Sequence, residues 1–307
     1  MAISEIKAKE RTGYLGGSDI AAVLGLSRWR TPLQLWGEKT GNIIPEDISG
    51  KLHVRLGNKL EQTVCDLFQE ETGKKVARVN DTLIHPVHSF LRGNIDRRIV
   101  GEKAVLEAKT TSAWNAKQWE GEEIPQEYLI QTYFYMELMG ADRGYVACLI
   151  GNQDFRVKVL ERDDVLQKQM IEKAVDFWTR YIVPKVMPSF ITSKDADTLY
   201  NLFPLGEEGE PIELGDEANA LIESIQAAKE DAKAIETLKD KQENELRVLL
   251  KEHAEGFTDK FKVTWKNQKT RRMDLPKMRI EVPEICAKYA ETTESRVLRI
   301  APLKKTK

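Results

Sequence analysis

The chain has 307 residues, enough for one full core and an appendage. With 31% charged residues and no window that approaches a membrane span or an apolar signal segment, we expect a cytoplasmic protein with no membrane partner. Cys65, Cys148 and Cys286 are dispersed, which fits a reducing cytosol and excludes a four-cysteine iron–sulfur cluster within one chain, and no phosphate-loop motif for ATP is present.

The first third of the chain predicts helices. Gly16-Gly17-Ser18-Asp19 has the residue types of a capped helix start before residues 20–24. A second helix begins at Thr31-Pro32 and closes at Gly41. A third helix spans about residues 51–72 and stops at Gly73. Its apolar stripe consists of Leu52, Leu56, Leu60, Val64, Leu67 and Phe68.

The middle of the chain mixes strands and helices. Extended segments are expected near residues 75–79, 82–85, 92–100 and 103–109. After them we expect a helix at 126–139, strands at 144–150 and 154–160, and a helix at about 164–183 before a proline. This order predicts an α/β fold around a central mixed sheet.

The last hundred residues predict an appendage. Apolar residues follow heptad spacing from Leu221 to Leu249, interrupted at Lys239 and Gln242, which favours a helical hairpin arm or a short coiled coil. A linker precedes it, with prolines at Pro188, Pro204 and Pro211.

Charge divides this appendage further. Residues 207–255 are acidic overall and residues 256–307 are basic, so a polyanion is a possible partner for the last segment. We expect a core at 1–200, a linker and arm at 201–255, and a basic tail at 256–307. The arm and tail either lack a partner, follow DNA phosphates or recruit a second protein.

Two neighbouring extended segments carry the candidate catalytic residues. Asp96 lies in the first, Glu107-Ala108-Lys109 lies in the second, and Gly101-Glu102-Lys103 favours a tight turn between them, which predicts a β-hairpin. Because side chains alternate along a strand, Glu107 and Lys109 project from one face. Magnesium prefers oxygen ligands, and a nearby lysine can orient or deprotonate the attacking water. The pattern favours phosphodiester hydrolysis, although a solvated hairpin face with an ion pair has the same spacing.

Two polar residues interrupt apolar helix faces. Glu61 shares a face with Val64 and Phe68, where a carboxylate is costly unless it is paired, coordinated or at the edge of the stripe. Gln131 shares a face with Tyr135 and needs hydrogen-bond partners, either at the site or in a loop. Because both residues flank the hairpin in sequence, we expect them to converge on it.

The order of these motifs resembles the YqaJ-type viral recombinase nucleases, the family of phage lambda exonuclease within the PD-(D/E)xK nuclease superfamily. The resemblance covers about residues 10–180 and includes Gly16-Gly17-Ser18-Asp19 and Leu35-Trp36-Gly37-Glu38-Lys39-Thr40-Gly41. Ile95 stands where the family usually has a proline before the aspartate. The resemblance implies a restriction-endonuclease-like α/β core, encoded by a phage or prophage and acting in a bacterial host cell.

The resemblance also implies a metal site. Asp96, Glu107 and the carbonyl group of Ala108 would bind Mg²⁺, for which Mn²⁺ can substitute. Glu61 would serve a second metal ion or its water. Catalysis would further involve Lys109, which would position the nucleophile, and Gln131, which would contact water or the terminal phosphate.

A second set of residues is expected to contact DNA. Arg11 and Ser18 match the family's anchor for a 5′-phosphate, although Ser18 is also a candidate helix cap. Asn94 stands where a small polar residue contacts phosphate in relatives. Trp29, next to Arg28, is a candidate for stacking on a base or wedging into a duplex end, or else for a partly buried place on the surface.

Other aromatic and histidine residues are given structural roles. Trp114 and Trp119 are expected in the core. His85 and His88 are expected on the surface, because no second pair of ligands follows at the spacing of a zinc site.

We therefore expect a magnesium-dependent, ATP-independent 5′→3′ exonuclease that acts on the ends of linear double-stranded DNA. It would leave 3′ single-stranded overhangs for recombination by annealing. The resemblance implies a ring-like homo-oligomer, a trimer, that works with a single-strand annealing protein. The alternatives are a structure-specific or restriction-like endonuclease on the same core and a catalytically silent DNA-end-binding protein.

Overall fold

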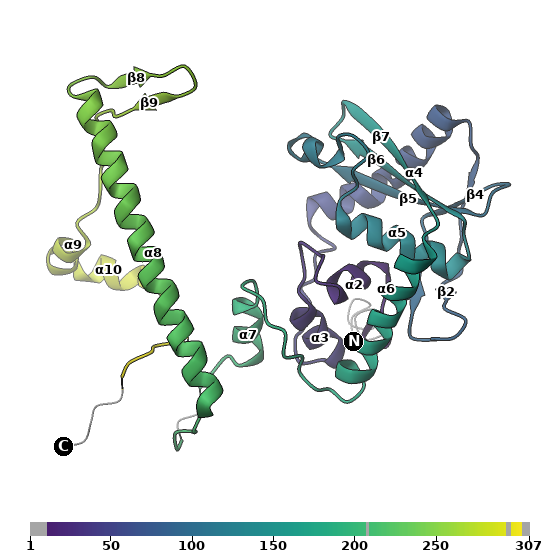
Figure 1. The fold of residues 1–307 in the computed structure, drawn as a ribbon, viewed down its shortest axis with the longest axis horizontal. Coiled ribbons are helices and arrows are strands. Elements are labelled where there is room, and N and C mark those ends of the chain that lie inside the picture. Colours follow the sequence, from purple (N-terminus) through teal and green to yellow (C-terminus); the bar gives the residue numbers. More distant parts are fainter. Residues whose placement is uncertain (1–10, 207–208, 293–295, 303–307) are drawn as a thin grey trace. The chain divides into compact units, whose positions relative to one another are not determined.

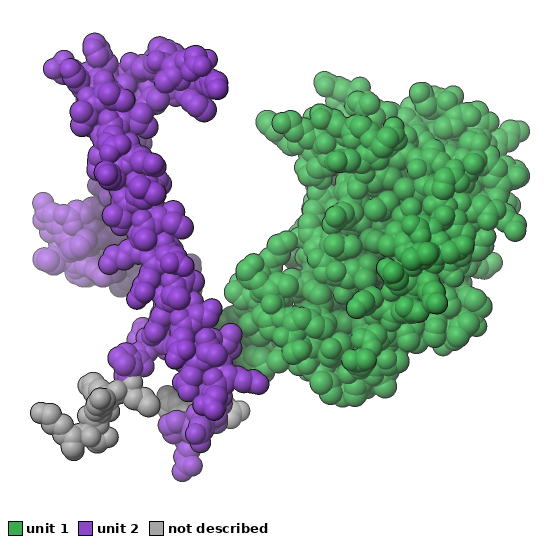
Figure 2. Space-filling view, viewed as in Figure 1, with its two compact units in different colours: residues 1–204 green, residues 205–307 purple. Residues whose placement is uncertain are grey.

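The computed structural model describes residues 11–206, 209–292 and 296–302. It divides into two compact units, Met1–Pro204 and Leu205–Lys307, which Figure 2 colours separately. Unit 1 holds the central sheet, and unit 2 is built on one long helix. Within the described ranges, every helix is too short or too polar to cross a bilayer.

Unit 1 is organised around a five-stranded mixed sheet with the order β1-β4-β5-β6-β7 (Figure 1). β5 and β6 run parallel, whereas the other neighbouring strands are antiparallel. A separate antiparallel pair joins β2 to β3. The strands are β1 (Val76–Ala77), β2 (Leu83–Ile84), β3 (Arg92–Gly93), β4 (Arg97–Ile99), β5 (Ala104–Thr111), β6 (Arg143–Ile150) and β7 (Asp154–Glu161).

Helices surround this sheet. They are α2 (Gly17–Val23), α3 (Pro32–Thr40), α4 (Leu52–Thr72), the 3-10 helix η1 (Ala113–Trp119), α5 (Gln126–Met139), α6 (Asp164–Phe177), the π-helical turn η2 (Trp178–Ile182) and α7 (Ala196–Leu202). The side chain of Thr31 caps α3 by accepting the N–H of Gln34 at 3.1 Å. Gly41 and Gly73 end α3 and α4 in the left-handed conformation, as the sequence predicts.

The two faces of the sheet bury different helices. On one face Val64 and Phe68 of α4 pack with Leu106 of β5. On the other face, α5 packs over Val105 of β5 and Val146 of β6. The alternation of β5 residues between the two faces is therefore confirmed. It directs Leu106 toward α4, and Glu107 toward the face covered by α5.

The apolar stripe predicted on α4 is only partly buried. Val64, Cys65 and Phe68 are fully buried, but Leu52 is 65% exposed and Leu56 is 43% exposed. The end of β5 carries Thr110 where the first half of α4 approaches it, since a Cβ built at Gly57 would lie 3.8 Å from Oγ1 of Thr110. Because this end of β5 is polar, Leu52 and Leu56 have no apolar surface to pack against there.

The extended segment expected at 92–100 is two strands. β3 pairs with β2, β4 pairs with β1 and β5, and the chain changes partner at residues 94–96. Asp96 therefore lies just before β4.

Unit 2 corrects the prediction of a helical hairpin. α8 (Gly215–Leu250) is one continuous helix of 36 residues. Lys239 and Gln242 interrupt the apolar seam, but both are good helix formers and do not end the helix. After it come β8 (Glu255–Phe257) and β9 (Lys262–Thr264), which form an antiparallel pair, and then α9 (Leu275–Glu281) and α10 (Pro283–Lys288). The predicted α/β core with a central mixed sheet and a helical appendage is confirmed.

Candidate active site

The β4–β5 hairpin brings Asp96 to the Glu107-Ala108-Lys109 segment. Arg97 pairs with Leu106, and the turn between the strands contains Gly101 with a φ of 85°. Asp96 continues this register, and its Oδ2 accepts the backbone N–H of Ala108 at 2.8 Å. At the end of the β4–β5 pairing, the Asp96 carboxylate thus accepts the backbone N–H of Ala108 in place of a backbone carbonyl group.

Lys109 connects the hairpin to α5. Its Nζ lies 2.5 Å from Oε1 of Glu107 and donates to Oε1 of Gln131 at 3.4 Å. Gln131 in turn donates from Nε2 to the hydroxyl oxygen of Tyr135 at 3.2 Å. Four of the predicted site residues, Asp96, Glu107, Lys109 and Gln131, therefore lie on one face of the sheet.

The electrostatics of this group follow from its burial. Burial, and after it the neighbouring Asp96, raise the pKa of Glu107 to about 7 against the opposing effect of Lys109. Burial also raises the pKa of Asp96, although Lys109 attracts its ionised form. Burial alone would lower the pKa of Lys109, but Glu107 and Asp96 outweigh it and raise that pKa. Lys109 is therefore an ammonium ion at neutral pH, suited to orient a nucleophile rather than to deprotonate it.

The donor set fits a hard divalent cation. Glu107 is 2% exposed, and its Oε2 is buried without a hydrogen-bond partner among the described residues. A buried carboxylate oxygen without a partner is costly, and magnesium binds such oxygens through one or two carboxylates. Asp96 and Glu107 supply these oxygens next to the backbone of Ala108.

Glu61 has a different neighbour from the one expected. Its Oε1 lies 2.6 Å from Nη1 of Arg97, which also donates to the carbonyl oxygen of Asp96 at 2.5 Å. Glu61 therefore approaches Asp96 through Arg97. Within the described part of the chain, no three His, Cys, Asp or Glu side chains gather as a metal-binding group.

Sequence reasoning missed Arg97, which is 4% exposed. The pattern Ile95-x-Arg97-x-Ile99 could have indicated it, because alternate residues of a strand share a face. An arginine between two apolar residues of a buried face needs a partner for its charge. It also missed Tyr128, whose ring centroid lies 4.9 Å from Nζ of Lys109.

Tyr135 is held by two glycines. A Cβ built at Gly17 would lie 2.6 Å from Cζ of the Tyr135 ring, and one built at Gly93 would lie 2.6 Å from Cε1. No larger residue leaves room for the ring at either position. α2 and β3 thereby fix the tyrosine that contacts Gln131.

The predicted phosphate-anchor residues lie around α2 and before β4. Arg11, Ser18 and Asn94 are exposed. Lys39 links the backbone at Arg11 to the start of α2, where Ser18 lies. Its Nζ donates to the carbonyl oxygen of Arg11 at 2.6 Å and pairs with Asp19 at 2.8 Å.

The suggestion that Ser18 caps α2 is wrong. The N-cap of α2 is Gly16, whose N–H donates to Oδ2 of Asp19 at 2.9 Å. Asp19 supplies the capping carboxylate three residues after the N-cap, as in a capping box. The side chain of Ser18 remains exposed within the helix.

Arg28 and Trp29 lie beside α5. Trp29 is 60% exposed, and its ring lies 5.8 Å from that of Tyr128. The guanidinium of Arg28 lies 4.5 Å from the Trp29 ring centroid and pairs with Glu127 at 2.6 Å.

The other aromatic and histidine predictions are mixed. Trp119 is buried as expected, but Trp114 is 95% exposed because η1 turns it away from the core. His85 is buried rather than on the surface, and its Nδ1 accepts the N–H groups of Val87 and His88 at 3.2 and 3.1 Å.

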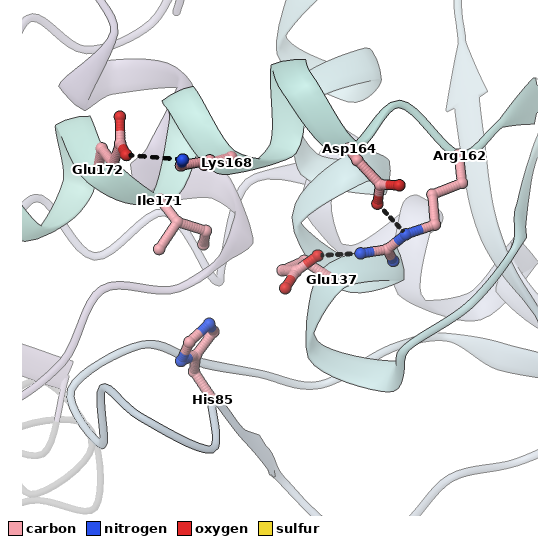
Figure 3. A pocket seen from close by; sticks show the side chains of 7 residues that line it. All are labelled: His85, Glu137, Arg162, Asp164, Lys168, Ile171 and Glu172. Atoms are coloured by element: carbon pink, nitrogen blue, oxygen red, sulfur yellow. Dashed lines mark hydrogen bonds and ion pairs between the residues drawn. The ribbon is translucent and has the colours of Figure 1, made fainter.

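His85 borders a cavity of about 230 Å³ that Figure 3 shows from close by. Its charged side chains satisfy one another: Arg162 pairs with Glu137 at 2.8 Å and with Asp164 at 2.5 Å. This cavity contains none of the residues around Lys109. We assign no chemistry to it.

Comparisons with known proteins identify the family of the chain. The model of the YqaJ-like viral recombinase domain matches residues 8–142. Across 290 residues the chain is 34% identical to the uncharacterized protein YqaJ of Bacillus subtilis strain 168, covering 94% of this chain and 91% of that protein.

Among solved structures, the chain resembles an alkaline exonuclease from Laribacter hongkongensis. The TM-score is 0.50 at 17% identity, and the match covers 59% of this chain and 94% of that one. The same enzyme in complex with dAMP matches with a TM-score of 0.50 at 18% identity. These likenesses show a shared fold. From its similarity to YqaJ over nearly its whole length and the match to the domain model, the chain belongs to the YqaJ-like viral recombinase family.

Proposed function

We propose that the protein is a magnesium-dependent 5′→3′ exonuclease on linear double-stranded DNA that leaves 3′ overhangs for recombination. The observation that carries this proposal is the buried, unpartnered Oε2 of Glu107 beside Asp96 and the Lys109 ammonium. An ion pair on a solvated strand would leave neither oxygen buried and unsatisfied. The alkaline exonuclease fold supports the reaction class.

The catalytic roles follow from charge and position. Asp96 and Glu107, with the Ala108 carbonyl, hold Mg²⁺ or Mn²⁺, which when bound supplies positive charge for the phosphate and acidifies water. Lys109 orients the nucleophile and offsets charge on the phosphate. Gln131 holds the position of Lys109 and contacts water or the terminal phosphate. Glu61 acts through Arg97 on the same carboxylates, or on a second cation.

The end of the DNA is recognised by residues outside the metal site. Arg11 and Ser18 hold the 5′-phosphate, with Asn94 as a further phosphate contact. Arginine suits this role because a charge-assisted bond to phosphate is strong and directional. Support comes from the link that Lys39 makes between the Arg11 and Ser18 segments.

The proposed assembly is a homotrimeric ring on DNA that works with a single-strand annealing protein. This part rests on the resemblance of the sequence motifs to the family of phage lambda exonuclease. Unit 2 offers the annealing protein a surface, because much of α8 is exposed, including Leu221, Ile235 and Leu249.

The test uses three DNA substrates with Mg²⁺: a 5′-labelled linear duplex, a 3′-labelled linear duplex and a closed circular plasmid. We expect early release of the 5′ label, late release of the 3′ label and an intact plasmid. A 5′-hydroxyl end should be degraded more slowly than a 5′-phosphate end. Cutting of the closed circle would indicate an endonuclease instead, and binding without cleavage would indicate a catalytically silent end-binding protein.

A further inference from the structure

Trp29 is an exposed aromatic side chain that its surroundings hold in place. It lies in the loop between α2 and α3 and remains 60% exposed. The Arg28 guanidinium lies 4.5 Å from its ring centroid, and the Tyr128 ring lies 5.8 Å away at an interplanar angle of 48°. Isolated exposed hydrophobic residues are common, but an indole supported by a cation and a second ring is pre-organised.

The Arg28 guanidinium that supports the Trp29 ring also forms an ion pair. Its Nε lies 2.6 Å from the Glu127 carboxylate, and its Nη1 donates to Gln118 at 2.7 Å. These two contacts fix the position of the guanidinium, and Glu127 offsets its charge. We therefore assign Arg28 first to the support of Trp29.

The supported indole is close to the proposed catalytic lysine. Tyr128 contacts both, because its ring centroid lies 4.9 Å from Nζ of Lys109 and 5.8 Å from the Trp29 ring. The distance from the Trp29 ring centroid to Nζ of Lys109 therefore cannot exceed the sum of these two distances. Since a stacked strand advances about 3.4 Å per nucleotide, Trp29 lies within about three nucleotides of a phosphate at Lys109.

Beside Arg28 lies a cleft of about 480 Å³, bordered by Gln118, Gln126 and Lys194 among others. Its volume falls within the range of small-ligand sites, so a nucleotide beside Arg28 has room. The exposed part of the Trp29 indole is apolar and flat, which suits a nucleobase and not a phosphate. In a duplex the interior bases already stack on their neighbours, so the base that it can take is unpaired.

We propose that Trp29 is a stacking platform for an unpaired base of the strand whose phosphate lies at Asp96 and Glu107. This inference rests on the proposed nuclease function and adds a specific contact to it. Tyr128 contacts both Trp29 and Lys109 and so fixes the distance between them. A base stacked on Trp29 would therefore align its strand with the catalytic residues.

The test measures DNA binding by the full-length chain with Ca²⁺ in place of Mg²⁺, which should allow binding with little cleavage. The probe is a fluorescent duplex with a 5′-phosphorylated unpaired tail of four nucleotides, in which each position in turn is abasic. In the wild-type chain, removal of one tail base should weaken binding by about 5- to 150-fold, the range for one stacked base. Trp29→Ala should weaken binding to the intact probe to a similar extent and show no further loss at that position. Trp29→Phe should keep part of the sensitivity.

Trp114→Ala is the matched control, because Trp114 is also an exposed tryptophan, at 95%, but follows the end of β5. It should keep the wild-type abasic profile. An unchanged profile in Trp29→Ala, with normal binding and cleavage, would contradict the platform alone. Sensitivity confined to the terminal base pair would also contradict it. A wild-type chain that does not bind DNA would contradict the proposed function and the platform together.

Discussion

In the proposed metal site, the protonation state of Glu107 sets the pH range in which a cation can bind. Its buried carboxyl group has a pKa of about 7, raised first by burial and then by Asp96. A carboxyl must be ionised to bind a metal ion, so binding competes with a proton below this pKa. Oε1 contacts Lys109, whereas Oε2 is buried without a hydrogen-bond partner among the described residues and is the oxygen proposed to bind the cation.

We predict that Mg²⁺ affinity falls about tenfold per pH unit below pH 7 and is nearly constant above pH 8. The raised pKa gives this sign, because the metal-free folded chain holds the proton up to about pH 7. Isothermal titration calorimetry of the full-length chain between pH 6 and 9 measures it. Glu107→Gln, which cannot ionise, should bind weakly at every pH. Equal affinities at pH 6 and pH 9 in the wild-type chain would mean that Glu107 is not a ligand.

Tyr135→Phe tests whether the tyrosine positions Gln131. The substitution keeps the ring between Gly17 and Gly93 and removes only the acceptor of the 3.2 Å bond from Gln131. Loss of one hydrogen bond of about 0.5–1.5 kcal/mol should lower the cleavage rate about 2- to 13-fold. DNA affinity should not change, and Tm should fall by no more than a few degrees. Tyr133→Phe, two residues earlier and on another face of α5, is the control, and equal effects of both substitutions would refute the positioning role.

At the scale of residues, the sequence predicted which side chains form the candidate site better than it predicted their hydrogen-bond and ion-pair partners. Asp96, Glu107 and Lys109 could be placed together because strand alternation and a short turn fix their geometry. The pairing of Glu61 with Arg97, 36 residues apart, depends on how α4 crosses the sheet. No local pattern encodes that crossing, so the partner of Glu61 could not be predicted.

At the scale of elements, a buried ionic cluster fastens α2 to α3. Asp19 is 1% exposed and pairs with Arg30 and with Lys39, the latter at 2.8 Å. Although burial opposes ionisation, Lys39 and Arg30 lower the pKa of Asp19 to about 2. Because the folded pKa is lower than the unfolded one, this stabilisation is present above about pH 4 and is lost as pH falls toward 2.

Asp19→Asn should therefore lower the free energy of unfolding by about 3–5 kcal/mol, because it leaves Lys39 and Arg30 buried without their carboxylate. Urea denaturation of unit 1 at pH 7 measures this. Glu102→Gln removes the partly exposed Lys74–Glu102 pair and should cost no more than about 1 kcal/mol. A similar small loss for both variants would show that the cluster does not hold the two helices.

The elements themselves were predicted unevenly, for physical reasons. Helix ends at Gly41 and Gly73 could be placed because each residue takes a positive φ, which glycine adopts without strain. The break between β3 and β4 could not, because a single extended run does not show where a strand changes partner. The single helix α8 excludes the hairpin alternative for the arm, because an interrupted heptad does not show whether the helix itself breaks.

At the scale of the molecule, all predicted site residues fall in unit 1. The buried apolar clusters that support the sheet also lie within it. Unit 2 is mostly exposed, with Leu250 as its buried apolar residue among those described. We therefore expect unit 2 to contribute little to the stability of the site.

A chain ending at Pro204 should consequently fold and keep its metal-dependent cleavage. We expect its Tm to match that of the corresponding transition in the full-length chain, because the buried apolar clusters that support the sheet lie within unit 1. Differential scanning calorimetry and cleavage of a short linear duplex measure the two properties. A truncated chain that aggregates or loses Mg²⁺-dependent cleavage would show that unit 2 belongs to the catalytic assembly.

The most direct test of the catalytic assignment is Mg²⁺-dependent release of nucleotides from linear duplex by Asp96→Ala, Glu107→Ala and Lys109→Ala. Each substitution removes a ligand or a water-orienting cation, so each should abolish release while the chain stays folded and binds DNA. Lys103→Ala, in the turn of the same hairpin, should keep the wild-type rate. Rates near that of the wild-type chain for any two of the three site variants would contradict the assignment of a nuclease site to this hairpin.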